Sequence, residues 1–433
     1  MSDAIDVRPI PRIETPFAAR LTLPGSKSIA LRHVVMSTLA DEPTRLLGVP
    51  RCEDVDAMFD AVQRLGTSVE RESRSAMLTP PAEPFESDVD LDLGMSGVSL
   101  RLLLAHAALR TSTTRFTGHR QLHQRPNADL LEALKTIGCE IESNQGRLPI
   151  RVAGPASPTA RTTLATGVTS QYLSGLMLSA PGLPSGLAIA LQGARTSASY
   201  IGVTTTEMAR RGVRVETPDE STVVVSPGRY TGGDVLIEGD ASAATYHAAL
   251  ATLHGGRITL TNLGNSTRQG DYAFLDLCER MGAEVSRAAD QVTIKGPASP
   301  KPVGDADMVD MPDAAPTLMA MAPFLPAPTH ITGLATLRVK ECDRIACAAK
   351  ELRKAGVPVE EFDAAMTIHP ADALRPAGFE TYEDHRMAMA LSVVASKIGG
   401  CVIHGADCVA KTYADYWEDF DRATGRVEAP TMG

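Results

Sequence analysis

The chain has 433 residues, more than one ordinary hydrophobic core holds, and this length predicts two or three domains. Its 43% hydrophobic and 22% charged residues are typical of a globular protein and exclude disorder for most of the chain. The net charge of −10 argues against a nucleic-acid partner, and no apolar run approaches the roughly 18 residues of a membrane span. Because the N-terminus also lacks the basic stretch and apolar core of a signal peptide, we expect a cytoplasmic protein.

Six amphipathic stretches along the chain each end at a glycine that is followed at once by a short β-like run. The glycines are Gly66, Gly138, Gly212, Gly282, Gly356 and Gly425. They lie roughly 70 residues apart, which indicates a repeated structural unit. Glycine at such a place adopts the left-handed conformation that ends a helix and turns the chain back as a strand.

Each unit has another predicted helix, rich in small and apolar residues, ahead of its amphipathic one. These helices are predicted over residues 28–40, 96–110, 170–180, 242–254, 314–324 and 385–395. Five units close with a further short run that makes a hairpin with the strand before it. These runs are residues 76–80, 149–154, 223–228, 292–296 and 366–370. The sixth unit lacks this run, and the stretch before Leu21 is free to supply the missing strand.

Six such units predict an α/β fold of βαβαββ-type repeats, grouped as two domains of three repeats each. The Gly-rich residues 228–239 are typical of a linker after the third unit. We therefore predict one domain over residues 25–239 and a second formed by residues 1–24 and 240–433, joined by two crossing segments. A double connection is a natural hinge, and we expect the functional site in the cleft between the domains.

Polar and basic residues gather where the predicted helices begin. In the first unit Lys27 and Ser28 open the helix, and Arg32 follows one turn later. The free N–H groups of a helix N-terminus, with a lysine and a hydroxyl beside them, form a site for phosphate or carboxylate. The run is not a nucleotide P-loop, which needs Gly directly before the lysine, because Ser26 stands there.

Equivalent loops of other units carry further cations and groups able to move protons. The cations are Arg125, Lys340, Arg344, Arg386 and Lys411. Their recurrence in a chain of net negative charge predicts a cleft for a doubly anionic ligand or for two anionic ligands. Asp313, Glu341 and His385 stand beside them and suit acid–base chemistry in a closed cleft. Structural alternatives remain open for these three residues, namely a helix cap, a salt-bridge partner of Arg344 and a core histidine.

The seven cysteines are scattered and show no C-x-x-C or His-paired spacing. No zinc site is therefore predicted, and no other metal or nucleotide motif is found. We expect reduced thiols that behave as small buried hydrophobes.

Taken together, these motifs resemble the enolpyruvyl transferase family, most closely its branch that uses shikimate 3-phosphate. The matching segments are LPGSKSIALR, RPNADLLEAL, TSQYLSGLMLSAP, GDASAATY, QGD, MPDAA, LRVKECDR, YEDHRMAMA and AKTYADY. They run from Leu23 to Tyr416 and so cover nearly the whole chain. The resemblance implies a two-domain inside-out α/β barrel, which agrees with the count of six units.

The resemblance implies transfer of the enolpyruvyl (1-carboxyvinyl) group of phosphoenolpyruvate to the 5-hydroxyl of shikimate 3-phosphate, with release of phosphate by addition and elimination. It implies a monomeric transferase of aromatic amino-acid biosynthesis that needs neither a metal nor an organic cofactor. Carried over residue by residue, it assigns phosphoenolpyruvate to Lys27, Gly97, Arg125, Gln171, Arg344, Arg386 and Lys411. It assigns the phosphorylated acceptor to Ser28, Arg32, Thr169, Ser170, Gln171, Ser197, Tyr200, Asp313 and Lys340.

The catalytic groups that the resemblance implies are Lys27, Asp313, Glu341 and His385. Asp313 and Lys27 would assist deprotonation of the acceptor hydroxyl. Glu341, with Lys27 and His385 nearby, would handle the proton at C3 of phosphoenolpyruvate.

Several positions depart from the family pattern. Met95 and Val98 replace an amide and a hydroxyl near the implied phosphoenolpyruvate pocket, while Leu31 and Thr336 stand where asparagine is usual or common. These departures leave open a relative that enolpyruvylates another phosphorylated acceptor, such as a nucleoside monophosphate, or a catalytically silent ligand-binding paralogue. The branch that acts on UDP-N-acetylglucosamine is disfavoured, because its loop cysteine has no counterpart in residues 117–126.

Branched apolar side chains at Val98 and Leu102 crowd the predicted helix that carries Gly97. Glyphosate occupies the phosphoenolpyruvate site in the family that the chain resembles. We therefore expect glyphosate to bind this protein poorly.

Overall fold

The computed structural model describes residues 6–82, 85–193 and 197–425. The chain divides into two compact units, unit 1 formed by Met1–Pro24 with Gly239–Gly433 and unit 2 formed by Gly25–Glu238. Gly239, which the sequence analysis assigns to the same domain as residue 25, falls in unit 1. Over the described part of the chain, no helix is both long and apolar enough to cross a membrane.

Unit 2 contains three repeats, each built around a four-stranded sheet. The first repeat comprises β14 (Gly233–Leu236), α1 (Lys27–Thr38), β3 (Thr44–Leu47), α2 (Glu53–Arg64), β4 (Ser68–Arg71) and β5 (Ser75–Thr79). The second comprises β6 (Val89–Asp92), α3 (Gly97–His106), η1 (Ala107–Leu109), β7 (Thr114–Thr117), α4 (Arg120–His123), α5 (Ala128–Ile137), β8 (Glu140–Asn144) and β9 (Arg147–Ala153). The third comprises β10 (Arg161–Ala165), α6 (Ser170–Ser179), η2 (Ala180–Gly182), β11 (Leu187–Gln192), α7 (Ala198–Arg210), β12 (Val215–Asp219) and β13 (Thr222–Val225).

Unit 1 repeats the same order of elements. Its first repeat comprises β2 (Ala18–Thr22), α8 (Ala241–His254), β15 (Arg257–Thr261), η3 (Gly270–Ala273), α9 (Phe274–Arg280), β16 (Glu284–Arg287) and β17 (Gln291–Lys295). The next comprises β18 (Ala306–Asp307), α10 (Ala315–Met321), η4 (Ala322–Phe324), β19 (Thr329–Thr332), η5 (Ala335–Val339), α11 (Arg344–Lys354), β20 (Val359–Glu361) and β21 (Met366–Ile368). The last comprises β22 (Gly378–Glu380), α12 (His385–Ile398), β23 (Cys401–His404), η6 (Ala406–Lys411), α13 (Tyr416–Ala423) and β1 (Val7–Ile10).

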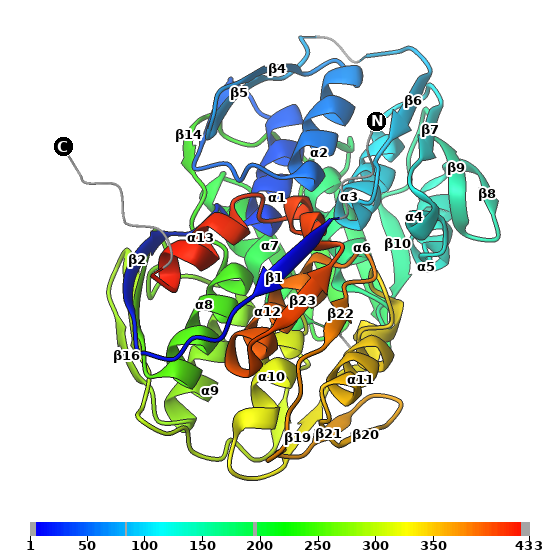
Figure 1. The fold of residues 1–433 in the computed structure, drawn as a ribbon. Coiled ribbons are helices and arrows are strands. Elements are labelled where there is room, and N and C mark those ends of the chain that lie inside the picture. Colours follow the sequence, from blue (N-terminus) through cyan, green and yellow to red (C-terminus); the bar gives the residue numbers. More distant parts are fainter. Residues whose placement is uncertain (1–5, 83–84, 194–196, 426–433) are drawn as a thin grey trace. The chain divides into compact units, whose positions relative to one another are not determined.

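The N-terminal strand completes the last repeat, as the sequence predicts. β1 pairs antiparallel with β23, which pairs parallel with β22, and Figure 1 shows the blue strand lying beside these two orange-red ones. The segment after Gly425, where a further strand is predicted, lies outside the described residues. The α/β fold of six repeats, three in each unit, is therefore confirmed.

Besides β1, two strands join the sheet of a repeat whose other strands lie far away in the sequence. β2 leads into α1 of unit 2 but pairs with β15 of unit 1, whereas β14 leads into α8 of unit 1 but pairs with β3 of unit 2. The chain thus passes between the units twice, at Pro24 to Gly25 and at Glu238 to Gly239.

Burial explains the two kinds of helix. The helices α1, α3, α6, α8, α10 and α12 are buried along nearly their whole length, and in each unit the three pack against one another. A helix without a polar face must lie inside the protein, and these sequences have none. The amphipathic helices instead lie against the sheets and stop at the six predicted glycines, whose φ angles range from 76° to 111°.

Candidate functional site

Lys27 begins α1, and its side chain is buried. Its Nζ lies 2.9 Å from Oδ2 of Asp54, a carboxylate in the first turn of α2 that is also buried. Ser99 of α3 donates its hydroxyl to the carbonyl of Asp54 at 3.3 Å. An ammonium group held by one buried carboxylate keeps its charge at a fixed place. The starts of α1, α2 and α3 therefore meet around Lys27.

Arg32 lies one turn further along α1 and is 2% exposed. Its Nη1 donates to the carbonyl of Ser28 at 2.7 Å, and its Nε donates to Oγ1 of Thr204 at 2.8 Å. Longer bonds from Nη2 reach Oγ of Ser174 at 3.3 Å and the carbonyl of Tyr200 at 3.4 Å. Burial lowers the pKa of Arg32 to about 10, which still leaves it charged at neutral pH. Arg32 thus ties together the starts of α1, α6 and α7.

Gly97 is the first residue of α3, and its missing side chain makes room for an arginine. A Cβ at this position would lie 2.1 Å from Nη1 of Arg125. Arg125 is itself buried, so its guanidinium rests against the first turn of α3. A helix N-terminus with an arginine across it binds an anion through both the N–H groups and the guanidinium.

Gln171 is held by another buried arginine, Arg101 of α3. Nη1 of Arg101 donates to Oε1 of Gln171 at 2.6 Å, while Nη2 reaches the carbonyl of Pro126 at 3.4 Å. The hydroxyl of Tyr172 donates to that same carbonyl at 2.6 Å. The loop that carries Arg125 is therefore anchored on α3 and α6.

The remaining predicted residues of unit 2 stand at the same helix starts. Thr169 caps α6 by accepting from the backbone N–H of Gln171 at 3.3 Å, and Ser170 follows it, largely buried. Ser197 precedes α7 with a φ of 52°, and Tyr200 lies in its first turn. We call this group the lysine half-site: Lys27, Ser28, Arg32, Asp54, Gly97, Arg101, Arg125, Thr169, Ser170, Gln171, Ser197 and Tyr200.

In unit 1, Asp313 is surrounded by cations. Its Oδ1 lies 3.1 Å from Nη1 of Arg344 and 3.6 Å from Nζ of Lys340, and its Oδ2 lies 2.9 Å from Nη2 of Arg386. The cap position of α10 is Ala314, so the alternative that Asp313 caps this helix is wrong.

Arg344 is 1% exposed and contacts three carboxylates. Besides Asp313 it donates to Oδ2 of Asp384 at 2.8 Å through Nε and to Oε2 of Glu341 at 2.9 Å through Nη2. Burial by itself lowers the pKa of Arg344, but the carboxylates, Asp384 foremost, raise it above its ordinary value. The guanidinium is therefore a permanent charge that fixes Asp313, Glu341 and Asp384 around itself.

Glu341, Lys411 and His385 complete this group, which we call the carboxylate half-site: Asp313, Lys340, Glu341, Arg344, Asp384, His385, Arg386 and Lys411. Oε1 of Glu341 lies 3.9 Å from Nζ of Lys411. The ring of His385 is 1% exposed, and its Nδ1 lies 3.9 Å from Oδ1 of Asp384. Glu341 is thus the predicted ion-pair partner of Arg344, and it also stands beside Lys411.

A further carboxylate, Asp271, lies close to this group. It is 4% exposed, it accepts a hydrogen bond from the hydroxyl of Ser242, and among the described residues its Oδ1 has no hydrogen-bond partner. Burial, with the carboxylate of Asp313 nearby, raises the pKa of Asp271 to about 7. Asp271 therefore holds a proton at pH values where ordinary aspartates have lost theirs.

The two half-sites share one chemical character, which is buried cations fixed by hydrogen bonds beside carboxylates, and the carboxylate half-site also contains His385. Such groups bind phosphate and carboxylate and move protons without reorganising first. Among the described residues, no cluster of three or more His, Cys, Asp or Glu side chains is arranged to hold a metal ion.

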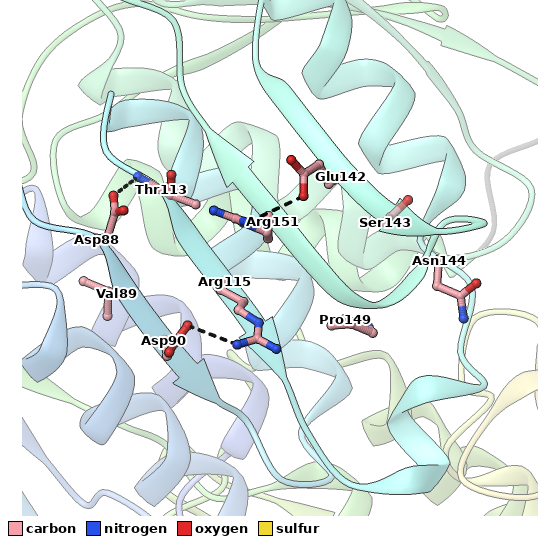
Figure 2. Close-up of a pocket in the computed structure, with 10 residues that line it drawn as sticks. All are labelled: Asp88, Val89, Asp90, Thr113, Arg115, Glu142, Ser143, Asn144, Pro149 and Arg151. Atoms are coloured by element: carbon pink, nitrogen blue, oxygen red, sulfur yellow. Dashed lines mark hydrogen bonds and ion pairs between the residues drawn. The ribbon is translucent and has the colours of Figure 1, made fainter.

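A large hollow elsewhere on unit 2 contains none of the predicted site residues. It has a volume of about 650 Å³ and lies on the outer face of the sheet formed by β6, β7, β9 and β8 (Figure 2). Nη1 of Arg115 lies 4.0 Å from Oδ1 of Asp90, and Nη1 of Arg151 lies 3.7 Å from Oε2 of Glu142. More than half of each of these four side chains is exposed. Exposed pairs of this kind are typical of a solvated sheet surface.

Sequence reasoning missed several residues of these networks, among them the four charged residues Asp54, Arg101, Asp271 and Asp384. Asp384 lies in the YEDHRMAMA segment, which the resemblance gives without a role for this residue; it accepts from the N–H of Arg386 at 2.9 Å and also binds Arg344. The QGD motif that contains Asp271 was noted without a role. Nothing local marks Asp54 or Arg101, because their partners are distant in the sequence: Lys27 lies 27 residues from Asp54, and Gln171 lies 70 residues from Arg101.

Comparison with known proteins identifies relatives that match nearly the whole chain. The family model described as EPSP synthase (3-phosphoshikimate 1-carboxyvinyltransferase) matches residues 11–420. The 3-phosphoshikimate 1-carboxyvinyltransferase of Shewanella pealeana is 34% identical over 410 residues, which are 93% of this chain and 96% of that one. The enzyme of that name from a Nostoc species is 35% identical over 422 residues, covering 96% and 99%.

Solved structures show the same fold. An EPSP synthase from Acinetobacter baumannii superposes with a TM-score of 0.78 at 23% identity and covers 96% of this chain and 97% of that one. The enolpyruvyl transferase NikO from Streptomyces tendae superposes with a TM-score of 0.74 at 17% identity over 95% of both chains. The inside-out α/β architecture expected from the resemblance is thereby confirmed.

Proposed function

Because the chain belongs to the EPSP synthase (3-phosphoshikimate 1-carboxyvinyltransferase) family, we propose that it transfers the enolpyruvyl group of phosphoenolpyruvate to the 5-hydroxyl of shikimate 3-phosphate. The match over residues 11–420 is the observation that carries this proposal. Each substrate bears a carboxylate and a phosphate, and each half-site offers buried cations that suit them.

The reaction proceeds by addition and then elimination. The 5-hydroxyl oxygen adds to C2 of phosphoenolpyruvate while C3 gains a proton, which gives a tetrahedral intermediate. C3 then loses a proton while the bond between C2 and the phosphate oxygen breaks. The products are the enolpyruvyl ether and inorganic phosphate. The enzyme must therefore supply a base for the hydroxyl, a group that gives and retakes the C3 proton, and cations for the departing phosphate.

The carboxylate half-site supplies the proton-moving groups in this proposal. Asp313 accepts the proton of the acceptor hydroxyl, and Glu341 delivers and removes the proton at C3, with His385 nearby. Arg344 and Arg386 bind the carboxylate of phosphoenolpyruvate. Support comes from the ion pairs that hold both carboxylates in place, 3.1 Å from Arg344 to Asp313 and 2.9 Å from Arg344 to Glu341.

The lysine half-site binds the phosphate and the acceptor. Lys27, Arg125 and Gln171, with the free N–H groups at Gly97, face the phosphate of phosphoenolpyruvate, and Lys411 of unit 1 joins them. The acceptor is bound at the starts of α1, α6 and α7, together with Lys340 and Asp313. The residues at these helix starts are Ser28, Arg32, Thr169, Ser170, Gln171, Ser197 and Tyr200. The short Lys27 to Asp54 pair supports this role, because a fixed ammonium group binds phosphate without losing side-chain entropy.

We propose that both units contribute groups to the reaction, and we expect a closing motion about the double connection when the ligands bind. Small-angle scattering with both substrates added measures the closure as a smaller radius of gyration. An unchanged scattering profile with both ligands bound would contradict it.

The deciding experiment mixes the purified protein with phosphoenolpyruvate and shikimate 3-phosphate in the presence of a metal chelator and follows phosphate release. Mass spectrometry of the product and a reaction without acceptor are the controls. We expect acceptor-dependent release and the enolpyruvyl adduct. If the protein binds phosphoenolpyruvate but releases no phosphate, shikimate 3-phosphate is refuted as the acceptor. Met95 and Val98 are then the first positions to examine for a different acceptor.

The comparisons do not favour the two alternatives that the departures from the family pattern leave open. The curated relatives bear the name 3-phosphoshikimate 1-carboxyvinyltransferase, not that of a transferase for a nucleoside acceptor or of a binding protein. We further propose a monomeric cytoplasmic enzyme, and light scattering during size-exclusion chromatography tests the oligomeric state.

A further inference from the structure

Two cysteines flank the start of α11, the helix whose first residue is Arg344. Asp343 caps this helix, with its Oδ1 accepting from the N–H of Ala346 at 3.1 Å. Cys342 therefore stands directly before the cap, and Cys347 is the fourth residue of the helix. Side chains at these two positions pack against each other across a capped helix start, an arrangement known as the hydrophobic staple. In this chain the staple consists of two thiols.

The staple touches the carboxylate half-site. Sγ of Cys342 donates to Oδ2 of Asp384 at 3.6 Å, and Nε of Arg344 donates to that same oxygen at 2.8 Å. Cys342 is also the residue directly after Glu341. A change at this sulfur is therefore passed on to the residues that hold the carboxylates in place.

The two thiols are accessible and unequal. Both are partly exposed, whereas Cys52, Cys139 and Cys278 are buried. Each thiol is the leading influence on the other, because the hydrogen bond between them lowers the pKa of Cys347 and raises the pKa of Cys342. Cys347 therefore ionises first and is the nucleophile of the pair, while Cys342 keeps its proton.

We propose that Cys342 and Cys347 form a reversible disulfide under peroxide and that this modification switches the carboxylate half-site off. The Cys347 thiolate attacks hydrogen peroxide, which breaks the O–O bond, releases hydroxide and leaves a sulfenic acid. The Cys342 sulfur then attacks the Cys347 sulfur and releases water, so two thiols and one peroxide become one disulfide and two waters. In reducing compartments, protein disulfides are usually transient and serve catalysis or redox sensing.

The bond changes the geometry next to the reacting groups. Sulfurs in a disulfide lie about 2.05 Å apart, so the loop that carries Cys342 must move toward α11 and give up its contact with Asp384. Glu341 precedes the moving residue and Arg344 follows it by two positions, so both lose their present positions. Displacements on the order of 1 Å in catalytic groups reduce turnover by about a hundredfold. This loss of turnover rests on the proposed function, but the formation of the disulfide does not.

The sequence allows a direct test of the bond. Trypsin cleaves after Lys340, Arg344 and Lys350, so the two cysteines fall in separate peptides, residues 341–344 and 345–350. After hydrogen peroxide treatment and digestion without reductant, we expect these peptides joined, two hydrogens lighter than their sum, and separated again by dithiothreitol. In parallel, we expect phosphate release to fall at least about tenfold and to recover with dithiothreitol.

Three variants test whether the peroxide response requires this pair of cysteines. Cys342→Ser and Cys347→Ala should fold, remain active and resist peroxide, whereas Cys408→Ser, at another partly exposed cysteine, should respond like the unchanged protein. Overoxidised Cys347 without a cross-link, or a cross-link to Cys408, would overturn the pairing. A joined peptide pair with unchanged turnover would overturn the switch. If the reduced protein does not release phosphate at all, the proposed function fails while the peptide measurement still decides the disulfide.

Discussion

Oδ2 of Asp313 lies 2.9 Å from Nη2 of Arg386, although 73 residues separate them in the chain. With Arg344 on the other oxygen of Asp313, the carboxylate is fixed by two guanidinium groups from the starts of two different helices. A carboxylate so fixed presents its remaining lone pairs in a constant direction, which a general base requires.

Replacing this base separates catalysis from binding. We expect Asp313→Asn to lower kcat by about 10² to 10⁴ while the dissociation constants of both substrates change by less than about tenfold. Asp276→Asn, at an exposed carboxylate of unit 1 paired with Arg287, is the matched control and should keep full activity. Equal losses in kcat and in binding would refute a catalytic role for Asp313.

The missing side chain of Gly97 is expected to matter for phosphoenolpyruvate. In Gly97→Ala the new Cβ displaces the end of Arg125, a flexible side chain that gives way, so the protein folds but its phosphate-binding group moves. We expect KM for phosphoenolpyruvate to rise by about ten- to a hundredfold, with a smaller change in kcat. Gly202→Ala in α7 meets no atom within 4 Å and should leave KM unchanged. A normal KM in Gly97→Ala would show that Arg125 does not bind this substrate.

The Lys27 to Asp54 pair predicts a specific pattern of stability. Removing one partner of a buried ion pair typically costs about 3–5 kcal/mol of unfolding free energy. Both Lys27→Met and Asp54→Leu should therefore be clearly destabilised, and the double variant should be less destabilised than the sum of the two. Urea unfolding followed by circular dichroism measures this coupling. Additive losses would mean that the two residues do not stabilise each other.

Asp271 is expected to make stability depend on pH. Its pKa is raised in the folded protein to about 7 by burial and by Asp313, above an ordinary value of 3.8, so the folded state binds more protons than the unfolded state between these values. The contribution of Asp271 is fully present below about pH 4 and is lost as the pH rises toward 7, with a slope of at most about 1.4 kcal/mol per pH unit.

The Asn variant removes this titration. Relative to the unchanged protein, Asp271→Asn should gain thermal stability steadily from pH 4 to pH 7 and then level off. Scanning calorimetry in overlapping buffers provides the measurement, and Asp305→Asn is the exposed control. A difference between the two proteins that stays constant over this range would refute the raised pKa.

Met95 and Val98 flank the start of α3 beside Gly97, where the family usually offers an amide and a hydroxyl. We expect weak inhibition by glyphosate, because the donors that would meet its charged groups are absent. The double variant Met95→Asn with Val98→Thr should increase glyphosate inhibition by about tenfold, the effect of roughly one hydrogen bond. Leu236→Thr, at a side chain 75% exposed, is the control. Tight inhibition of the unchanged protein, competitive with phosphoenolpyruvate, would contradict the crowding.

Much of the candidate site follows from position within the repeat. Lys27, Gly97, Ser170, Asp313 and His385 all stand at or next to the start of a buried helix, so a repeat found in the sequence places them at equivalent points. Their partners are not predictable in this way. In the sequence, Asp54 and Arg101 cannot be distinguished from charged residues that lie on the surface. Only the fold brings Lys27 to Asp54 and Gln171 to Arg101.

The sequence by itself determined the six repeats, the two kinds of helix and the glycines that end them, because helical periodicity and positive φ angles are local properties of the chain. Only the tertiary structure decided that β2 pairs with β15 and β14 with β3, since strand pairing across more than 180 residues depends on which edges meet in the folded chain. It also decided that Arg344 joins Asp313, Glu341 and Asp384, because a buried charge takes its partners from whatever the packing brings within hydrogen-bond reach.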